Sequence, residues 1–213
     1  MTDARSAVTT TPRHSTQEQT EITRVQHTLD ALHSYNTPDP VEEAFRQRML
    51  ALITVDGDPF SRRWESPGHF TASAFVLSPD EAQVLLIRHR KLQRWLQPGG
   101  HFEPDDVDVE AATRREVAEE TGLSAMTPLH EGLFDVDVHA IPAHGDDVAH
   151  AHFDLRMAYR AETWSLSDTD EVDDVRWVPL ADVAHMETDA SVLRAVGRLI
   201  LRLREGRGGE IIG

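Results

Sequence analysis

The 213-residue chain contains no cysteine, which excludes disulfide bonds, thiolate metal ligands and cysteine nucleophiles. It also lacks a long apolar run: no stretch approaches the roughly 18 residues that a membrane-spanning helix needs. The polar N-terminal stretch has no hydrophobic segment typical of a secretory signal. These absences predict a protein of the reducing cytoplasm that has no membrane partner.

Basic residues are scarce, since 21 Lys and Arg stand against 37 Asp and Glu, for a formal net charge of −16. Nucleic-acid binding needs a basic footprint, so we expect no stable nucleic-acid partner. The same charge would repel a phosphate-bearing substrate unless metal ions or a local basic patch intervene. The hydrophobic content of 39% is nevertheless sufficient for the core of one domain.

The N-terminal third of the chain has a helical pattern. Residues 1–16 are polar and aperiodic, as is typical of a flexible arm. Apolar residues then recur at helical spacing over residues 20–35 and 40–52, on either side of the breaker Thr37–Pro40. We interpret residues 17–62 as a helical extension packed on the main domain, with a homodimer contact as the alternative.

The rest of the chain mixes strand and helix patterns. Apolar and alternating runs predict strands over residues 70–77, 83–89, 129–141, 152–161 and 174–178. One helix is expected within residues 108–122 and another over residues 189–205. The order of these elements predicts an α/β domain over residues 63–205, with a mixed sheet between helices and a flexible tail over residues 206–213.

The most informative stretch is PGGHFEPDDVDVEAATRREVAEETGL, which runs from Pro98 to Leu123. Glu116, Glu119 and Glu120 fall on one helix face, where like charges repel by a few tenths of a kcal/mol per pair. Gly122 is the expected helix end, so these carboxylates lie at the negative end of the helix dipole. A divalent cation would remove both penalties; a solvated acidic face is the alternative.

These residues resemble the Nudix hydrolase family, whose motif reads G-x5-E-x7-R-E-U-x-E-E-x-G-U, where U is aliphatic. Arg115–Leu123 matches the second half of the motif and Gly99–Gly100 matches its start. One extra residue lies between the halves, around Asp105–Asp108. Counting forward from the glycines places Asp106 at the family's first glutamate, whereas counting back from the arginine places Val107 there. The motif alone leaves the role of Asp106 open.

The resemblance implies a Nudix-type α/β/α sandwich and a Mg²⁺ cofactor, with Mn²⁺ as a substitute. It makes Glu119 and Glu120 metal ligands, with Glu116 either a further ligand or the general base. It also makes Arg115 their orienting partner and gives the Gly99–Gly100 loop a carbonyl ligand. Magnesium prefers such oxygen ligands together with substrate phosphates.

Further candidates flank the motif. The arginines before it would hold substrate phosphates, and the following tryptophan would stack on a base or belong to the core. Two histidines on one strand face would contact a metal or phosphates, and an acidic loop would supply the base. The arginines are Arg88, Arg90 and Arg94, and the tryptophan is Trp95. The histidines are His150 and His152, and the loop carries Glu171 with Asp170 behind it.

The resemblance therefore implies hydrolysis of a phosphoanhydride bond in a nucleoside diphosphate linked to another moiety, X. The identity of X is not legible in the sequence. The extra motif residue and the N-terminal helices motivate an alternative, a non-catalytic Nudix-like domain that binds a nucleotide and regulates another process. An isoprenoid-diphosphate isomerase on the same scaffold is excluded because it needs a catalytic cysteine.

Overall fold

The computed structural model describes residues 13–143, 145, 148–167 and 169–209. The first twelve residues of the predicted arm and the last four of the predicted tail lie outside these ranges. In chain order, the elements are α1 (Arg13–Ser34), α2 (Pro40–Leu52), β1 (Gly68–Leu77), β2 (Gln83–His89), β3 (Arg94–Leu96), β4 (Gly99–His101), α3 (Val109–Thr121), β5 (Met126–Pro128), β6 (Asp135–Ile141), β7 (His150–Ala161), β8 (Asp174–Pro179), the 3-10 turn η1 (Val183–His185) and α4 (Ala190–Gly209).

The strands form one mixed, eight-stranded sheet around a parallel pair, β1 and β7. These two strands pair over ten residues, from Gly68 opposite Ala151 to Leu77 opposite Arg160. All other pairings are antiparallel: β2 and β4 pair with different parts of β1, β5 and β6 pair with different parts of β7, and β3 and β8 pair with β2. The parallel pair lies at the centre, so it fixes the position of β4 with its two glycines.

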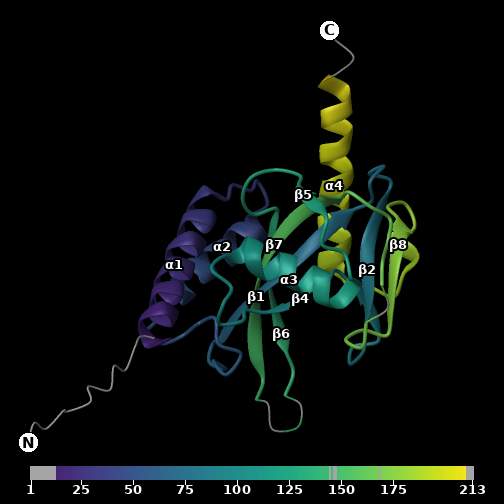
Figure 1. Cartoon of the computed structure of the whole chain (residues 1–213). Helices are drawn as coiled ribbons and strands as arrows, with labels where there is room; N and C mark the ends of the chain where they lie inside the picture. The colour runs from purple at the N-terminus through teal and green to yellow at the C-terminus, as the bar shows by residue number, and fades with distance from the viewer. Residues whose placement is uncertain (1–12, 144, 146–147, 168, 210–213) are drawn as a thin grey trace, which may run out of the picture.

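Alternate side chains of β1 enter two separate cores. Ala72 and Val76 pack with apolar residues of α1, α2 and α3, whereas Phe75 and Leu77 pack with residues of α4. Figure 1 shows the sheet between these two helical layers. The predicted α/β/α sandwich with a mixed sheet and N-terminal helices is therefore confirmed. Within the described ranges, none of the helices combines the length and apolar character needed to cross a membrane.

The N-terminal helices are joined to the rest of the chain by a buried ion pair. Glu42 of α2 is fully buried, and its carboxylate accepts a hydrogen bond from the Tyr35 hydroxyl at 2.7 Å. It also pairs with Arg198 and, at 3.3 Å, with Nε of Arg194, both from α4. Removing one partner of such a pair would leave an uncompensated buried charge. A role of these helices in dimerisation stays a prediction.

Some boundaries differ from the predicted ones. The three-residue strands β3, β4 and β5 were not expected, because so short a segment carries no periodicity and is defined by pairing with neighbouring strands. Strand β6 begins at residue 135 rather than 129. Helix α1 begins inside the predicted arm, and α4 continues into the predicted tail. Two residues predicted on apolar helix faces, Ile22 and Val41, are exposed.

Candidate active site

Helix α3 has defined caps at both ends. The Asp108 carboxylate accepts a hydrogen bond from the backbone N–H of Ala111 at 2.7 Å, which makes Asp108 the N-cap. Gly122 ends the helix in the left-handed conformation at φ 71°. A Cβ there would lie 2.6 Å from Cβ of Ser167. This close approach brings the loop that follows β7 against the acidic end of α3.

Two of the three motif glutamates are buried against β4. Glu116 and Glu120 are each 8% exposed, whereas Glu119 is exposed. Oε2 of Glu120 accepts a hydrogen bond from the backbone N–H of Gly99 at 2.9 Å. A Cβ on Gly100 would lie only 2.6 Å from Oε1 of Glu116, so glycine allows the strand to approach the carboxylate. The acidic face is therefore not a solvated surface.

Burial changes the protonation of both carboxylates. It raises the pKa of Glu116 to about 7, against the opposing effect of Arg115, and it raises the pKa of Glu120 to about 8. The charge of Glu171 raises both pKa values further. A bound cation would favour the ionised forms. The all-oxygen donor set and the glycine approach thus fit a hard divalent cation such as Mg²⁺.

Arg115 organises the acidic face. Its guanidinium donates to Glu116 at 3.0 Å, to Glu119 at 2.8 Å, to the buried carboxylate of Asp106 at 2.8 Å and to the carbonyl of His101 at 2.8 Å. The contact with Asp106 favours the alignment counted forward from the glycines, in which the extra residue falls after Asp106, just before α3.

Helix α1 supports the loop that carries Asp106. Nε of Arg24 donates to the carbonyl of Asp106 at 2.6 Å, and its Nη2 donates to the carbonyls of Glu103 and Pro104 at 2.6 and 3.0 Å. The guanidinium lies over the ring of Phe102, 5.6 Å from its centroid. Sequence reasoning missed Arg24, because about eighty residues separate it from the loop and no local pattern marks it.

We expect Asp106→Asn to lower kcat about 10-fold or more. The variant removes a buried charge that holds Arg115, and small displacements of catalytic groups cost up to about 100-fold. Steady-state kinetics on a cleaved substrate would measure the effect. Asp105→Asn, one residue away and exposed, is the matched control and should retain normal turnover. Equal activity of the two variants would contradict the positioning role of Asp106.

The loop with Glu171 packs on the C-terminal end of α3. The backbone N–H of Ser167 donates to the carbonyl of Thr121 at 2.9 Å. The Thr169 hydroxyl donates to the carbonyl of Glu120 at 3.1 Å. Glu171 itself is exposed, yet its charge acts on the two buried glutamates. This position is compatible with the predicted role of Glu171 as the general base.

The predicted basic cluster is partly paired within the protein. Arg90 contacts Asp173 at 3.2 Å and Arg88 lies 3.8 Å from Glu187, whereas Arg94 is exposed. Trp95 is 5% exposed and belongs to the core packed against α4. Its ring also lies under the guanidinium of Arg176, 4.8 Å from the ring centroid. This burial favours the core alternative for Trp95 over stacking on a base.

The two predicted histidines belong to a larger group. The rings of His150 and His152 lie 5.2 Å apart, and the ring of His69 lies 5.0 and 4.9 Å from them. Burial, with the neighbouring imidazoles, lowers the pKa of His101 to about 4 and that of His152 to about 2. Substrate contact by His150 and His152 stays a prediction. Sequence reasoning missed two members, His69 and His101, since only sheet pairing brings them together.

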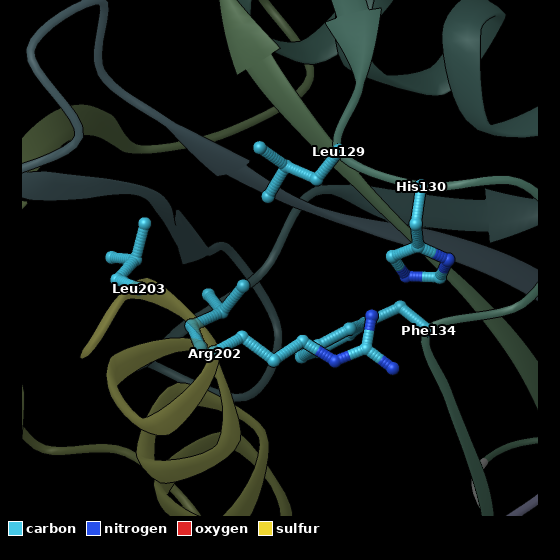
Figure 2. A pocket seen from close by; sticks show the side chains of 6 residues that line it. Leu129, His130, Phe134, Arg202 and Leu203 are labelled. Atoms are coloured by element: carbon cyan, nitrogen blue, oxygen red, sulfur yellow. The ribbon is translucent and has the colours of Figure 1, made fainter. Parts of the chain in front are cut away.

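A separate cavity of about 130 Å³ lies between α4 and the segment before β6, and Figure 2 shows the side chains that line it. Its lining is mostly apolar, and the side chain of Arg202 lies over the ring of Phe134, 5.5 Å from the centroid. No motif glutamate contributes to the lining. Ligand pockets usually measure about 300–1,000 Å³, so this cavity is too small for a nucleotide.

The sequence profile of the NUDIX domain matches residues 67–196, more than half of the chain. The chain therefore belongs to the Nudix family. A curated relative from Bacillus subtilis (strain 168), called "Putative 8-oxo-dGTP diphosphatase", is 36% identical over 66 residues. That alignment spans 30% of this chain and 44% of the relative, so the likeness covers less than half of that protein.

Two solved structures are similar to this chain. An Ap4A hydrolase from C. elegans, in a binary complex, superposes with a TM-score of 0.50 at 16% identity, covering 64% of this chain and 98% of that one. A NUDIX-family hydrolase from Clostridium perfringens gives a TM-score of 0.48 at 25% identity, covering 62% and 97%. The superposition on the C. elegans enzyme shows the shared architecture alone.

Proposed function

We propose that this Nudix-family protein is a metal-dependent hydrolase of a phosphoanhydride bond in a nucleoside diphosphate linked to another moiety. Its main support is the burial of Glu116 and Glu120 against Gly99–Gly100 at the end of α3. Two buried carboxylates beside each other are unfavourable without a cation. The name of the Bacillus subtilis relative favours a nucleotide as the substrate.

In this proposal Glu116, Glu119 and Glu120 hold Mg²⁺, or Mn²⁺ in its place, with a carbonyl of the glycine strand. When bound, the cation supplies charge stabilisation at phosphorus and a more acidic water. Arg115 keeps Glu116 and Glu119 in one orientation through its hydrogen bonds to both. Glu171 accepts the proton of the attacking water, as a general base in an exposed loop above the buried glutamates.

Arg94 is the arginine best placed to bind outer phosphates. Among the described residues, no carboxylate lies within salt-bridge distance of Arg94, whereas Arg88 and Arg90 each have an acidic partner. A free guanidinium binds phosphate oxygens in a bidentate manner. In a chain with a net charge of −16, such a local cation offsets the repulsion of an anionic substrate.

The decisive experiment is a substrate screen with Mg²⁺ and with Mn²⁺. Nucleoside triphosphates, nucleotide sugars and dinucleotides would be incubated with the protein, and released phosphate would be measured after coupling to pyrophosphatase for the triphosphates and to phosphatase for the nucleotide sugars and dinucleotides, whose phosphates are protected until the bond is cleaved. We expect turnover of at least one class, abolished by a chelator and restored by Mg²⁺. Thermal stabilisation by a nucleotide without any turnover would instead support the regulatory, non-catalytic alternative.

A further inference from the structure

Five histidines gather on one face of the sheet. His69 of β1 lies opposite His152 of β7, which in turn lies opposite His139 of β6. Residues paired in this way present their side chains on the same face. His150 precedes His152 by two residues, and His101 of β4 lies opposite Thr71, two residues after His69. Because strand residues two apart share a face, all five imidazoles are neighbours.

The hydrogen bond of His69 fixes its tautomer. Its Nδ1 lies 2.9 Å from the carbonyl oxygen of Trp64, which can only accept, so Nδ1 carries the proton. The opposite nitrogen, Nε2, therefore presents a lone pair. His69 is 1% exposed, and its buried Nε2 has no hydrogen-bond partner among the described residues. A buried, unpaired acceptor of this kind needs a ligand to compensate its desolvation.

Two further imidazoles have the same arrangement. Nδ1 of His150 donates to the carbonyl of Val148 at 2.8 Å, and Nδ1 of His139 donates to the carboxylate of Asp137 at 3.0 Å. In each ring Nε2 is left as the free nitrogen. Histidines that ligate a metal usually donate their other ring N–H to a carbonyl or a carboxylate, which orients the ring. Three of the five histidines, His69, His139 and His150, thus already have such an outer partner.

We propose that His69, His101 and His152 form a second metal site, separate from the glutamates, that binds a transition metal ion such as Zn²⁺. One ligand nitrogen from each of the three lies within 4.8 Å of the others. Tetrahedral Zn²⁺ with bonds of about 2.0–2.1 Å needs nitrogens about 3.4 Å apart, so the ligand nitrogens would approach one another by up to about 1.4 Å. His150 is the nearest candidate for the fourth ligand.

The ligand type separates this site from the carboxylates. Imidazole nitrogen suits Zn²⁺, Cu²⁺, Ni²⁺ and Fe²⁺, whereas Mg²⁺ prefers the oxygen ligands of the glutamates. The ion would join β1, β4 and β7. Strand β4 also carries Gly99–Gly100 and, through the carbonyl of His101, holds Arg115. The second ion would therefore stabilise the strand on which the glutamates rest.

The test uses the full chain after removal of metals with a chelator. Zn²⁺ would be titrated calorimetrically, and Co²⁺ would be titrated by visible absorption, both with excess Mg²⁺ present to fill the oxygen site. We expect one equivalent of Zn²⁺ per chain, an intense tetrahedral Co²⁺ spectrum and a rise in Tm on binding. His152→Gln should weaken Zn²⁺ binding more than about 100-fold, beyond the effect of losing an outer partner.

His130→Gln is the matched control. His130 also has a buried Nε2 without a partner among the described residues and an Nδ1 bound to a backbone carbonyl, but it lies outside the cluster. Its replacement should leave Zn²⁺ affinity unchanged. His101→Gln serves as a second ligand variant if His152→Gln does not fold. Wild-type binding no tighter than that of the ligand variants, a six-coordinate Co²⁺ spectrum, or equal loss in the control would overturn the proposal. Substrate turnover is not needed for this measurement, so it is independent of the proposed hydrolysis.

Discussion

Glu120→Gln is expected to lower kcat by at least about 10³-fold while the fold remains intact. Glutamine keeps an oxygen that accepts the hydrogen bond of the Gly99 N–H, so β4 retains its position. The variant loses the negative charge that the proposed cation needs. Phosphate-release kinetics at saturating Mg²⁺ would measure the effect, and circular dichroism would verify the fold. Near-normal turnover of the variant would contradict the proposed role of Glu120 as a metal ligand.

Glu110→Gln on the same helix is the matched control, since Glu110 forms only a partly exposed pair with Arg114.

The stability of the Glu120→Gln variant as a function of pH is an independent prediction. Burial raises the folded-state pKa of Glu120 to about 8, so the free energy of unfolding falls as the pH rises from about 4.5 toward 8. Glutamine does not titrate. Without metal, the variant should gain on the order of a few kcal/mol over wild type at pH 8.5, and this gain should fall toward zero below about pH 4. Thermal unfolding would show a gain that disappears in acid.

Arg156→Met should have the largest effect on stability, a loss of about 3–5 kcal/mol. Arg156 is 1% exposed and contacts Asp154 at 2.7 Å, Asp135 at 3.1 Å and Asp137 at 3.4 Å. Methionine fills similar space but leaves three buried carboxylates with less compensation. Urea unfolding at pH 7.5 would measure the loss. The deficit should shrink in acid, because burial already raises the pKa of Asp135, which takes up a proton more readily once the charge of Arg156 is gone.

Arg160→Met on the same strand provides the comparison. Arg160 is exposed and lies 3.5 Å from Glu81, and a surface pair of this kind contributes at most about 1 kcal/mol. If both substitutions destabilised the protein equally, Arg156 would not be needed to compensate the charges of the buried aspartates. A difference of several kcal/mol between the two variants in the free energy of unfolding would instead show that this buried charged cluster stabilises the protein.

The local features of the active site could be predicted from the sequence. The caps of α3 and the shared face of its glutamates depend on residues at most four positions apart, where helical geometry decides contacts. The pair of Arg115 with Glu119 is of this kind and is confirmed. The role of Asp106 could not be predicted, because one additional residue before the helix made two alignments equally acceptable.

Features that depend on strand pairing were not predictable. His69 and His152 are 83 positions apart and meet only because β1 and β7 run parallel in a fixed register. Strand β4 was expected to be a loop, so His101 had no predicted face. The burial of Trp95 follows from packing against α4. Each of these contacts depends on which strands pair and in which register. The spacing of apolar residues predicts the individual strands and helices but not this pairing.

The contacts of α1 and α2 predict how an N-terminally truncated form of the protein would behave. A product that starts at residue 63 would keep all the residues proposed for chemistry and the whole matched profile. It would lose Arg24, which holds the loop of Asp106, and Glu42, which neutralises Arg194 and Arg198. Such a product should be prone to aggregate and poorly active.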